Sequence, residues 1–273
     1  MIKRSAIALV ALFMAFGAVF GIHYAQALTS YDDLQAGDLI KGQTFTAVYY
    51  LGADGMRYVF PNDKTYFTWY ADFDDVKWIS DTDLAKIQIG GNVTYKPGVR
   101  MIKINSDPKT YAISSGGVLR HIGSESLAVS LYGSNWNTKI DDVPDGFFSN
   151  YTIGSEITST SDYSPSLQTA SAENIGNDKG LIAPEEISIT SIEFDPVCVG
   201  IEVGQGVRFT NDDSTKHSVT ADNLRWGSGT MNAGDEYIKV FKDDGVYPFY
   251  DGYDSSSTGA IYVGSYSDDC VTM

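Results

Sequence analysis

The residues that could carry metal or redox chemistry are few. The 273-residue chain has three histidines and two cysteines, Cys198 and Cys270. Two cysteines can neither complete a four-cysteine zinc site nor hold an iron–sulfur cluster alone. His121 and His217 lie far apart in the chain, and neither belongs to a visible nucleophile–base arrangement. General acid–base catalysis would therefore depend on carboxylates, and the sequence does not show which of them lie in pairs. We expect no enzymatic activity.

The composition excludes a second class of function. The chain has 19 Lys and Arg residues against 35 Asp and Glu residues, which gives a formal net charge of −16. Such an acidic surface repels the phosphates of nucleic acids, so we expect no nucleic-acid partner. The many aromatic and glycine residues are typical of a mainly β protein.

The first 27 residues have the pattern of a secretory signal peptide. Lys3 and Arg4 precede an apolar run over 6–22, and small residues before Ala27 mark a cleavage site after it. An uncleaved membrane anchor is the alternative, because the run is near the lower length limit for a span. We expect an exported, secreted chain (extracellular, at the cell surface or periplasmic) with no membrane span after cleavage.

Export determines how the two cysteines are interpreted. Cys198 and Cys270 are 72 positions apart. In an oxidising compartment, an isolated pair is most simply a disulfide. A free, buried pair is the alternative.

Residues 28–157 contain an internal repeat. An offset of 62 residues aligns 48–60 with 110–122, and a two-residue insertion follows further downstream. A fixed period of this kind indicates two copies of one supersecondary unit. The copies are expected over about 37–96 and 98–157.

Each copy is expected to form a small α+β unit. Asp54-Gly55 and Gly116-Gly117 predict type I′ hairpin turns. The helix that follows is expected to begin at Asn62 in the first copy and at Ser124 in the second. Apolar side chains at helical spacing are expected to lie in the core: Phe67, Tyr70, Val129 and Tyr132.

The first copy resembles a repeat that is common in exported proteins of uncultured candidate-phyla bacteria. Residues 37–42 read Gly-Asp-Leu-Ile-Lys-Gly, and residues 47–55 read Ala-Val-Tyr-Tyr-Leu-Gly-Ala-Asp-Gly. The resemblance extends to about Ile157. It implies an envelope or surface setting and no particular chemistry.

The second half of the chain has a different pattern. Residues 158–186 are rich in Ser, Thr, Asn and Asp and are expected to be a linker. Residues 187–266 contain about seven short alternating segments separated by turn-formers, which predicts an antiparallel β-sandwich. Residues 267–273 are expected to be a C-terminal tail.

The motif order over 187–266 resembles that of cupredoxins, nearest to the small bacterial and plastocyanin-type group. The motifs are Phe194-Asp195-Pro196, Lys216-His217-Ser218-Val219-Thr220, Gly245-Val246-Tyr247-Pro248-Phe249-Tyr250 and Gly259-Ala260-Ile261-Tyr262-Val263. The resemblance implies a Greek-key sandwich. In this family, copper is bound by a first His and by a Cys-x-x-His-x-x-Met loop before the last strand.

The resemblance also implies that the type 1 copper ligands have been lost. His217 stands at the first His position, but Asp251 stands at the Cys position, Asp254 at the second His and Ser257 at the Met. A hard, mostly oxygen site without a thiolate does not suit copper electron transfer. We therefore expect a degenerate copper site and no bound cofactor.

Two alternatives stay open for this loop. One is a copper-binding electron-transfer protein with a non-standard site around His217. The other is a Ca²⁺ site at Asp251 and Asp254, with Asp222 or Asp213 as a further ligand. His217 itself has a third interpretation, as a strand-end residue that only hydrogen-bonds to neighbouring backbone. The favoured function is a non-enzymatic binding or structural protein of the cell envelope, with a glycan or a protein as partner.

Overall fold

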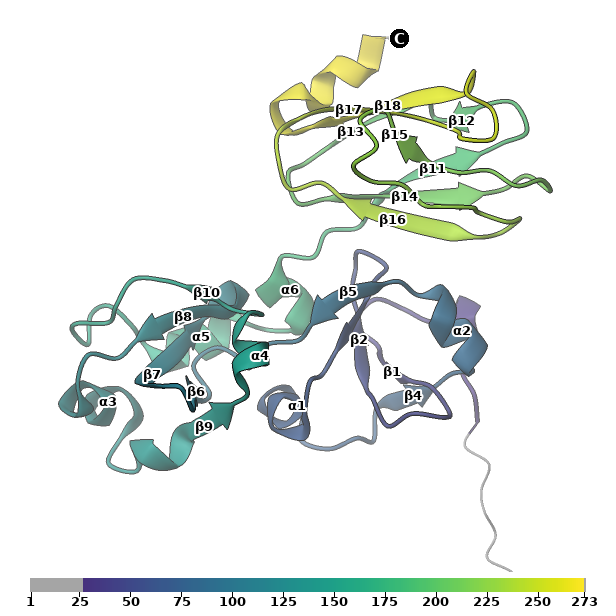
Figure 1. Cartoon of the computed structure of the whole chain (residues 1–273). Helices are drawn as coiled ribbons and strands as arrows, with labels where there is room; N and C mark the ends of the chain where they lie inside the picture. Colours follow the sequence, from purple (N-terminus) through teal and green to yellow (C-terminus); the bar gives the residue numbers. More distant parts are fainter. Residues whose placement is uncertain (1–26, 273) are drawn as a thin grey trace, which may run out of the picture.

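The computed structural model describes residues 27–272, and side chains up to Cys270. The chain has more strand than helix and forms two five-stranded sheets followed by a sandwich of two four-stranded sheets (Figure 1). The proposed signal peptide lies outside the described residues, except for Ala27. Within the described part, no helix is long and apolar enough to cross a membrane.

The first sheet has the strand order β4-β1-β2-β3-β5. A short 3₁₀ helix, η1 (Tyr31–Asp33), precedes it. Its strands are β1 (Leu39–Lys41), β2 (Tyr49–Leu51), β3 (Arg57–Val59), β4 (Val76–Trp78) and β5 (Ile89–Asn92). Its helices are α1 (Asp63–Trp69), between β3 and β4, and α2 (Asp81–Lys86), between β4 and β5.

The second sheet repeats this topology as β9-β6-β7-β8-β10. Its strands are β6 (Met101–Ile104), β7 (Asp107–Ser114), β8 (Val118–His121), β9 (Ile140–Val143) and β10 (Thr152–Ile153), and its helices are α3 (Glu125–Tyr132) and α4 (Asp145–Phe148). Every strand of the first sheet has a counterpart with the same neighbours and the same relative directions. The two α+β units therefore resemble each other, as the repeat predicts.

The structure places the two-residue insertion between the first helix and the fourth strand of the unit. Helices α1 and α3 begin at Asp63 and Glu125, 62 residues apart, whereas β4 and β9 begin at Val76 and Ile140, 64 residues apart. A 3₁₀ helix, η3 (Trp136–Lys139), occupies this connection in the second copy.

The expected type I′ turn is wrong in the first copy, whereas Gly116 and Gly117 of the second copy both have the positive φ that such a turn requires, 72° and 71°, within a longer loop. In the first copy β2 and β3 last pair at Leu51 and Arg57, so five residues form the loop. The Gly55 amide donates to the Gly52 carbonyl at 3.1 Å, and Gly55 has φ 77° while Asp54 does not have a positive φ. The second loop has three residues, with a 3₁₀ turn, η2 (Ser115–Gly117). Glycine is needed there because a left-handed backbone is costly for other residues.

The expected helix starts are confirmed. The Asn62 side chain accepts a hydrogen bond from the Thr65 amide at 2.8 Å, and the Ser124 hydroxyl accepts one from the Leu127 amide at 3.3 Å. Each cap satisfies an amide that has no partner inside the helix.

The expected inward faces of these helices are only partly right. Tyr132 is buried, but Phe67 is 49% and Val129 38% exposed. Tyr70 has an extended backbone and lies beyond the end of α1, but its partly buried ring packs against the core cluster as expected. Tyr66 is the fully buried aromatic side chain of α1, and Trp69 packs partly buried against the same cluster.

The segment expected to be a linker is folded. It contains α5 (Pro165–Ser171) and α6 (Ile175–Lys179), and β11 begins before its end. The buried Tyr163 donates its hydroxyl hydrogen to the carbonyl of Ile113 at 2.7 Å, and the amide of Gly176 donates to the Tyr50 hydroxyl at 3.1 Å. Its apolar residues are too widely spaced to show a period, yet they pack on both α+β units.

The sandwich consists of sheets β12-β11-β14-β16 and β13-β18-β17-β15. The strands are β11 (Glu185–Ile189), β12 (Phe194–Asp195), β13 (Cys198–Ile201), β14 (Gly206–Asn211), β15 (Thr220–Ala221), β16 (Glu236–Val240), β17 (Gly245–Tyr250) and β18 (Thr258–Val263). Most pairs are antiparallel, but β11 with β14 and β13 with β18 are parallel. Between the sheets, the fully buried rings of Phe194, Phe209 and Phe249 pack edge to face.

The predicted disulfide between Cys198 and Cys270 is confirmed, with their Cα atoms 5.8 Å apart. It joins β13 to the 3₁₀ helix η4 (Gly264–Thr272). Up to Thr272, the expected C-terminal tail thus lies within η4, which the disulfide attaches to the sandwich.

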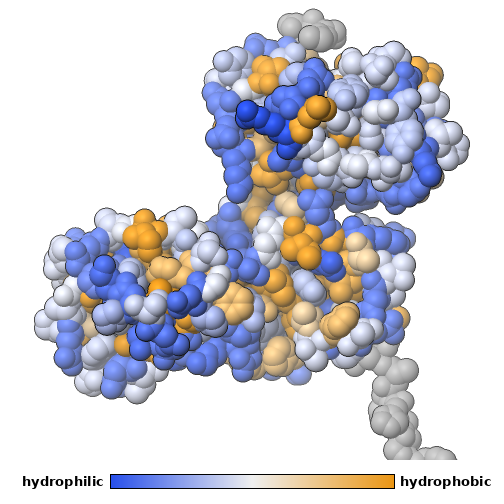
Figure 2. All heavy atoms as spheres, in the orientation of Figure 1, coloured by the Kyte–Doolittle hydropathy of each residue, from blue (hydrophilic) through white to orange (hydrophobic). Residues whose placement is uncertain are grey.

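The sandwich contacts the first α+β unit through its edge strand β16, the sandwich strand nearest that unit in Figure 1. Ile238 packs in one apolar cluster with Met56 and Tyr58. The Gln88 side chain donates to the Ile238 carbonyl at 2.9 Å and accepts from its amide at 3.2 Å. Apolar residues also gather at the narrow waist in Figure 2. An amide side chain thus covers part of a strand edge that would otherwise be open to pairing.

Candidate functional site

His217 is held where two loops of the sandwich meet. Its main chain exchanges two hydrogen bonds with Met231, at 3.1 and 2.9 Å. The fully buried Asn211, at the end of β14, donates its amide hydrogens to the carbonyls of Thr215 and Met231 at 2.8 and 3.0 Å. It also accepts from the amide of Asp213 at 3.0 Å. Asn211 therefore fixes the loop that presents His217.

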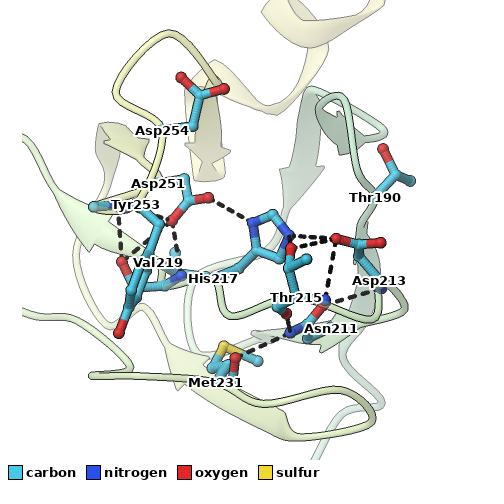
Figure 3. Close-up of polar contacts among 12 residues, drawn as sticks. Thr190, Asn211, Asp213, Thr215, His217, Val219, Met231, Asp251, Tyr253 and Asp254 are labelled. Atoms are coloured by element: carbon cyan, nitrogen blue, oxygen red, sulfur yellow. Dashed lines mark hydrogen bonds and ion pairs between the residues drawn. The ribbon is translucent and has the colours of Figure 1, made fainter.

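Asp251 lies against one ring nitrogen of His217 (Figure 3). Its Oδ2 is 2.6 Å from Nδ1, and its side chain is 1% exposed. Oδ1 accepts hydrogen bonds from the amides of Ser218 at 2.8 Å and Tyr253 at 3.0 Å. Asp251 follows the end of β17 directly, so that strand sets its position. The buried carboxylate is thus both hydrogen-bonded and paired, as a buried charge requires.

Asp213 and Thr215 lie against the other ring nitrogen. Asp213 Oδ2 is 3.1 Å and Thr215 Oγ1 is 3.2 Å from Nε2 of His217. The order Thr–His–Asp has the outline of a nucleophile, a base and an orienting carboxylate. However, the Thr215 hydroxyl donates to Asp213 at 2.5 Å, so its hydrogen is not directed at the ring. The arrangement is therefore a polar network and not an activated nucleophile.

Two neighbouring carboxylates determine the charge of His217. Burial lowers the pKa of His217, but the hydrogen bonds and charges of Asp251 and Asp213 outweigh burial and raise the pKa above 6.5. Hydrogen bonds from Thr215 and His217 hold the pKa of Asp213 well below its usual range. In the protonated imidazolium both ring nitrogens donate, so each meets an acceptor.

Asp254 and Ser257 do not join this network. Asp254 points away from His217 in Figure 3, and its Oδ1 accepts hydrogen bonds from the hydroxyl and amide of Ser256 at 2.6 and 3.0 Å. These bonds lower the pKa of Asp254. Ser257 acts through its main chain, where its carbonyl accepts from the Asp251 amide at 3.0 Å. Of the three loop positions, only Asp251 therefore meets His217 side chain to side chain.

These residues do not fit a type 1 copper ion. Such a site needs two imidazoles and a thiolate, whereas both cysteines form the disulfide and His121 lies in the second α+β unit. Asp251 and Asp213 contact opposite nitrogens of one ring, so they do not converge on a common point. Among the described residues, no three His, Cys, Asp or Glu side chains are placed to hold a metal ion.

They do not fit a calcium ion either, because Ca²⁺ takes six to eight converging oxygens. Asp251 and Asp254 diverge, and Asp222 is exposed outside the network. The third interpretation of His217 is right that the ring is hydrogen-bonded, but its partners are side chains and not neighbouring backbone. The sequence did not single out Asn211 and Thr215. The run Asn-Asp-Asp-Ser-Thr at 211–215 is a turn signal that would have drawn attention to them.

Comparison with known proteins gives matches among solved structures only, since no protein-family model and no curated protein matches the chain. The matching part is the C-terminal sandwich. The purple cupredoxin from Nitrosopumilus maritimus is 28% identical over 29% of this chain and 99% of its own, with a TM-score of 0.28. A point mutant of amicyanin, in its Cu(I) form, is 19% identical over 29% of this chain and 81% of its own, with a TM-score of 0.28.

The copper-containing nitrite reductase from Thermus scotoductus is 20% identical over 29% of this chain and 22% of its own, again with a TM-score of 0.28. The two-sheet architecture and the strand motifs of residues 187–266 define a cupredoxin-like domain. Of the four ligand positions that the resemblance assigns, the first holds His217, and the others hold Asp251, Asp254 and Ser257.

Proposed function

We propose that this is an exported, non-enzymatic binding or structural protein of the cell envelope or the extracellular space. Its cupredoxin-like domain serves as a stable module and not as an electron carrier. The observation that carries the proposal is the ion-paired His217, whose two ring nitrogens face Asp251 and Asp213.

The pairing has a direct chemical consequence for metal binding. An imidazole binds a metal through an unprotonated ring nitrogen, so a cation must compete with the proton that His217 retains between two carboxylates. The ion would then find carboxylate oxygens, which suit Mg²⁺ or Ca²⁺ better than copper. Neither a thiolate nor a second imidazole is available at the loop to stabilise Cu(I).

The proposed export is supported by the disulfide, because such bonds persist in oxidising compartments outside the cytoplasm. The duplicated α+β units add a large surface without a visible nucleophile–base pair. We infer that the partner is an envelope component, either a glycan or a protein.

A titration with Cu(II), followed by absorption spectroscopy, tests the proposal. We expect no intense blue thiolate-to-copper band. His121→Ala is the matched control for non-specific binding, because His121 is the other histidine among the described residues. A blue band that survives in His121→Ala and disappears in His217→Ala would overturn the proposal in favour of electron transfer.

Calorimetry with Ca²⁺ tests the hard-cation alternative. We expect no stoichiometric heat of binding. Saturable Ca²⁺ binding that is abolished by Asp251→Asn combined with Asp254→Asn would show that the loop is a cation site.

A further inference from the structure

A cavity of about 610 Å³ lies where the two α+β units, α6 and the sandwich meet. Tyr58 and Gly90 of the first unit line it, with Gly116 from the second hairpin, Lys179 from α6 and Lys239 from β16. Figure 1 shows α6 between the second sheet and β5, on the side that faces the sandwich. None of these residues belongs to the His217 network.

The cavity concentrates positive charge in a very acidic protein. Lys179, Lys239 and Lys242 line it, although the chain carries a net charge of −16. None of the three forms an ion pair within 4.0 Å in the described part of the chain, whereas Lys64, Lys77, Lys86 and Lys103 each do. Three lysines line this one cavity, and their summed charge favours an anionic occupant.

Asp54 is the one carboxylate among the residues that line the cavity, and each of its two oxygens accepts a hydrogen bond. It is 4% exposed and accepts hydrogen bonds from the Tyr58 hydroxyl and, at 3.2 Å, from the Met56 amide. Burial raises the pKa of Asp54, against the effect of these hydrogen bonds. Asp54 therefore opposes an anion much less than a free carboxylate would.

Lys179 lies close to an aromatic ring of the cavity lining. Its ammonium lies 5.1 Å from the centre of the Tyr58 ring. Burial lowers the pKa of Lys179, and the charges of Asp178 and Asp54 only partly compensate. A partly buried cation without a close counter-ion gains stability when an anion binds beside it.

The remaining lining suits a small organic molecule. Gly180 and Gly204 have open space where a side chain would lie, so a ligand could approach polar backbone groups there. Met56, Leu181 and Ile238 supply apolar surface. Apolar walls with a few convergent polar groups are typical of small-molecule sites.

We propose that this junction cavity binds a small organic molecule that carries a phosphate or carboxylate group, with the charges of Lys179 from α6, Lys239 from β16 and Lys242 attracting that group. Such a ligand would contact α6, the first unit and the sandwich together. Its binding would therefore also hold the sandwich against the N-terminal units. The inference does not depend on the proposed loss of copper chemistry.

Three sugars that share a ring and differ in charge are suitable probes: glucose 6-phosphate, glucuronate and neutral glucose. Isothermal calorimetry would be run at about 50 mM and about 500 mM salt, which changes the screening length severalfold. We expect binding of one or both anions at low salt, a loss of affinity of about tenfold or more at high salt, and no binding of glucose. The tighter of the two anions identifies the preferred group.

Charge-removing variants locate the site. We expect Lys179→Met, and separately Lys239→Met with Lys242→Met, to weaken anion binding by about tenfold or more. Lys109→Met is the matched control, because it removes the same charge from the exposed edge of the second hairpin. The two sets of lysines lie on different elements, so a folding defect in one variant, detected by circular dichroism, leaves the other as a test. Absence of anion binding to the wild type, equal binding of glucose, or equal weakening by Lys109→Met would overturn the proposal.

Discussion

His217 shows how the neighbours of one side chain decide its chemistry. The same imidazole that the strand motif places at a copper-ligand position here lies between Asp251 and Asp213. Burial of a lone histidine would favour its neutral form, but two carboxylates reverse that preference. The residue type alone therefore did not determine the role of this position, because the charges that act on it come from two separate loops.

A pH dependence of stability follows from this network. The pKa of folded His217 is raised above its ordinary value of 6.5. The ion pair therefore contributes fully below pH 6.5, and its contribution is lost as the pH rises through the raised pKa. We expect the difference in unfolding free energy between wild type and His217→Gln to decrease from about pH 5 to about pH 9. Denaturant unfolding across this range measures it.

His121→Gln is the control for this measurement. His121 contacts Glu156 at 3.1 Å on the surface, where ion pairs contribute only about 0–1 kcal/mol. We expect a small difference with little change across the same pH range. The interpretation would be contradicted if an NMR titration gave His217 a pKa at or below 6.5, or if the stability difference for His217→Gln increased with pH.

At the scale of elements, Gln88 and β16 show how a single side chain joins two units. Gln88 precedes β5, and its amide group pairs with both main-chain groups of Ile238. The contact imitates one step of strand pairing at the edge of the sandwich. Thr152 occupies the corresponding place in the second unit, where β10 is exposed and pairs only with β8.

We predict that Gln88→Ala weakens the attachment of the sandwich. Two hydrogen bonds are lost, at about 1 kcal/mol each, and the Ile238 amide becomes open to solvent. Hydrogen exchange measured by mass spectrometry should show faster exchange in 236–240, with unchanged exchange in the sandwich core. Thr152→Ala is the matched control and should alter neither region. Unchanged protection of 236–240 in Gln88→Ala would show that the apolar contacts of Ile238 alone hold the strand.

The helices illustrate what local sequence can and cannot specify. Asn62 and Ser124 were identifiable as caps because capping depends on residues two or three positions away. The buried face of α1 was assigned wrongly, since a seven-residue helix is too short for its period to fix a phase. Exposure of Phe67 and burial of Tyr66 depend on which sheet surface the helix meets.

At the scale of the whole molecule, one covalent link joins the start and the end of the cupredoxin-like domain. Cys198 and Cys270 close a loop of 72 positions and attach η4 to β13. The disulfide should stabilise the folded state by about 4 kcal/mol, because it restricts the unfolded chain.

We predict that Cys198→Ser combined with Cys270→Ser lowers the unfolding free energy of the sandwich by about that amount, about 4 kcal/mol. Denaturant unfolding with and without a reducing agent measures it. The wild type should lose stability on reduction, whereas the double variant should not respond. Equal stability of oxidised and reduced wild type would mean that packing alone holds η4.

The sequence by itself determined the features that rest on short-range pattern or on covalent chemistry. These are the duplicated unit, the two-sheet sandwich, the helix caps and the disulfide. Only the tertiary structure decided that Asp251 and Asp213 enclose His217. It also decided that residues 158–186 form α5 and α6 and pack on the α+β units. The same holds for the lysines from separate elements that line one cavity. The physical reason is distance along the chain. Contacts such as His217 with Asp251, 34 positions apart, or Gln88 with Ile238, 150 positions apart, leave no periodic signal, because they form only when packed elements bring the residues together.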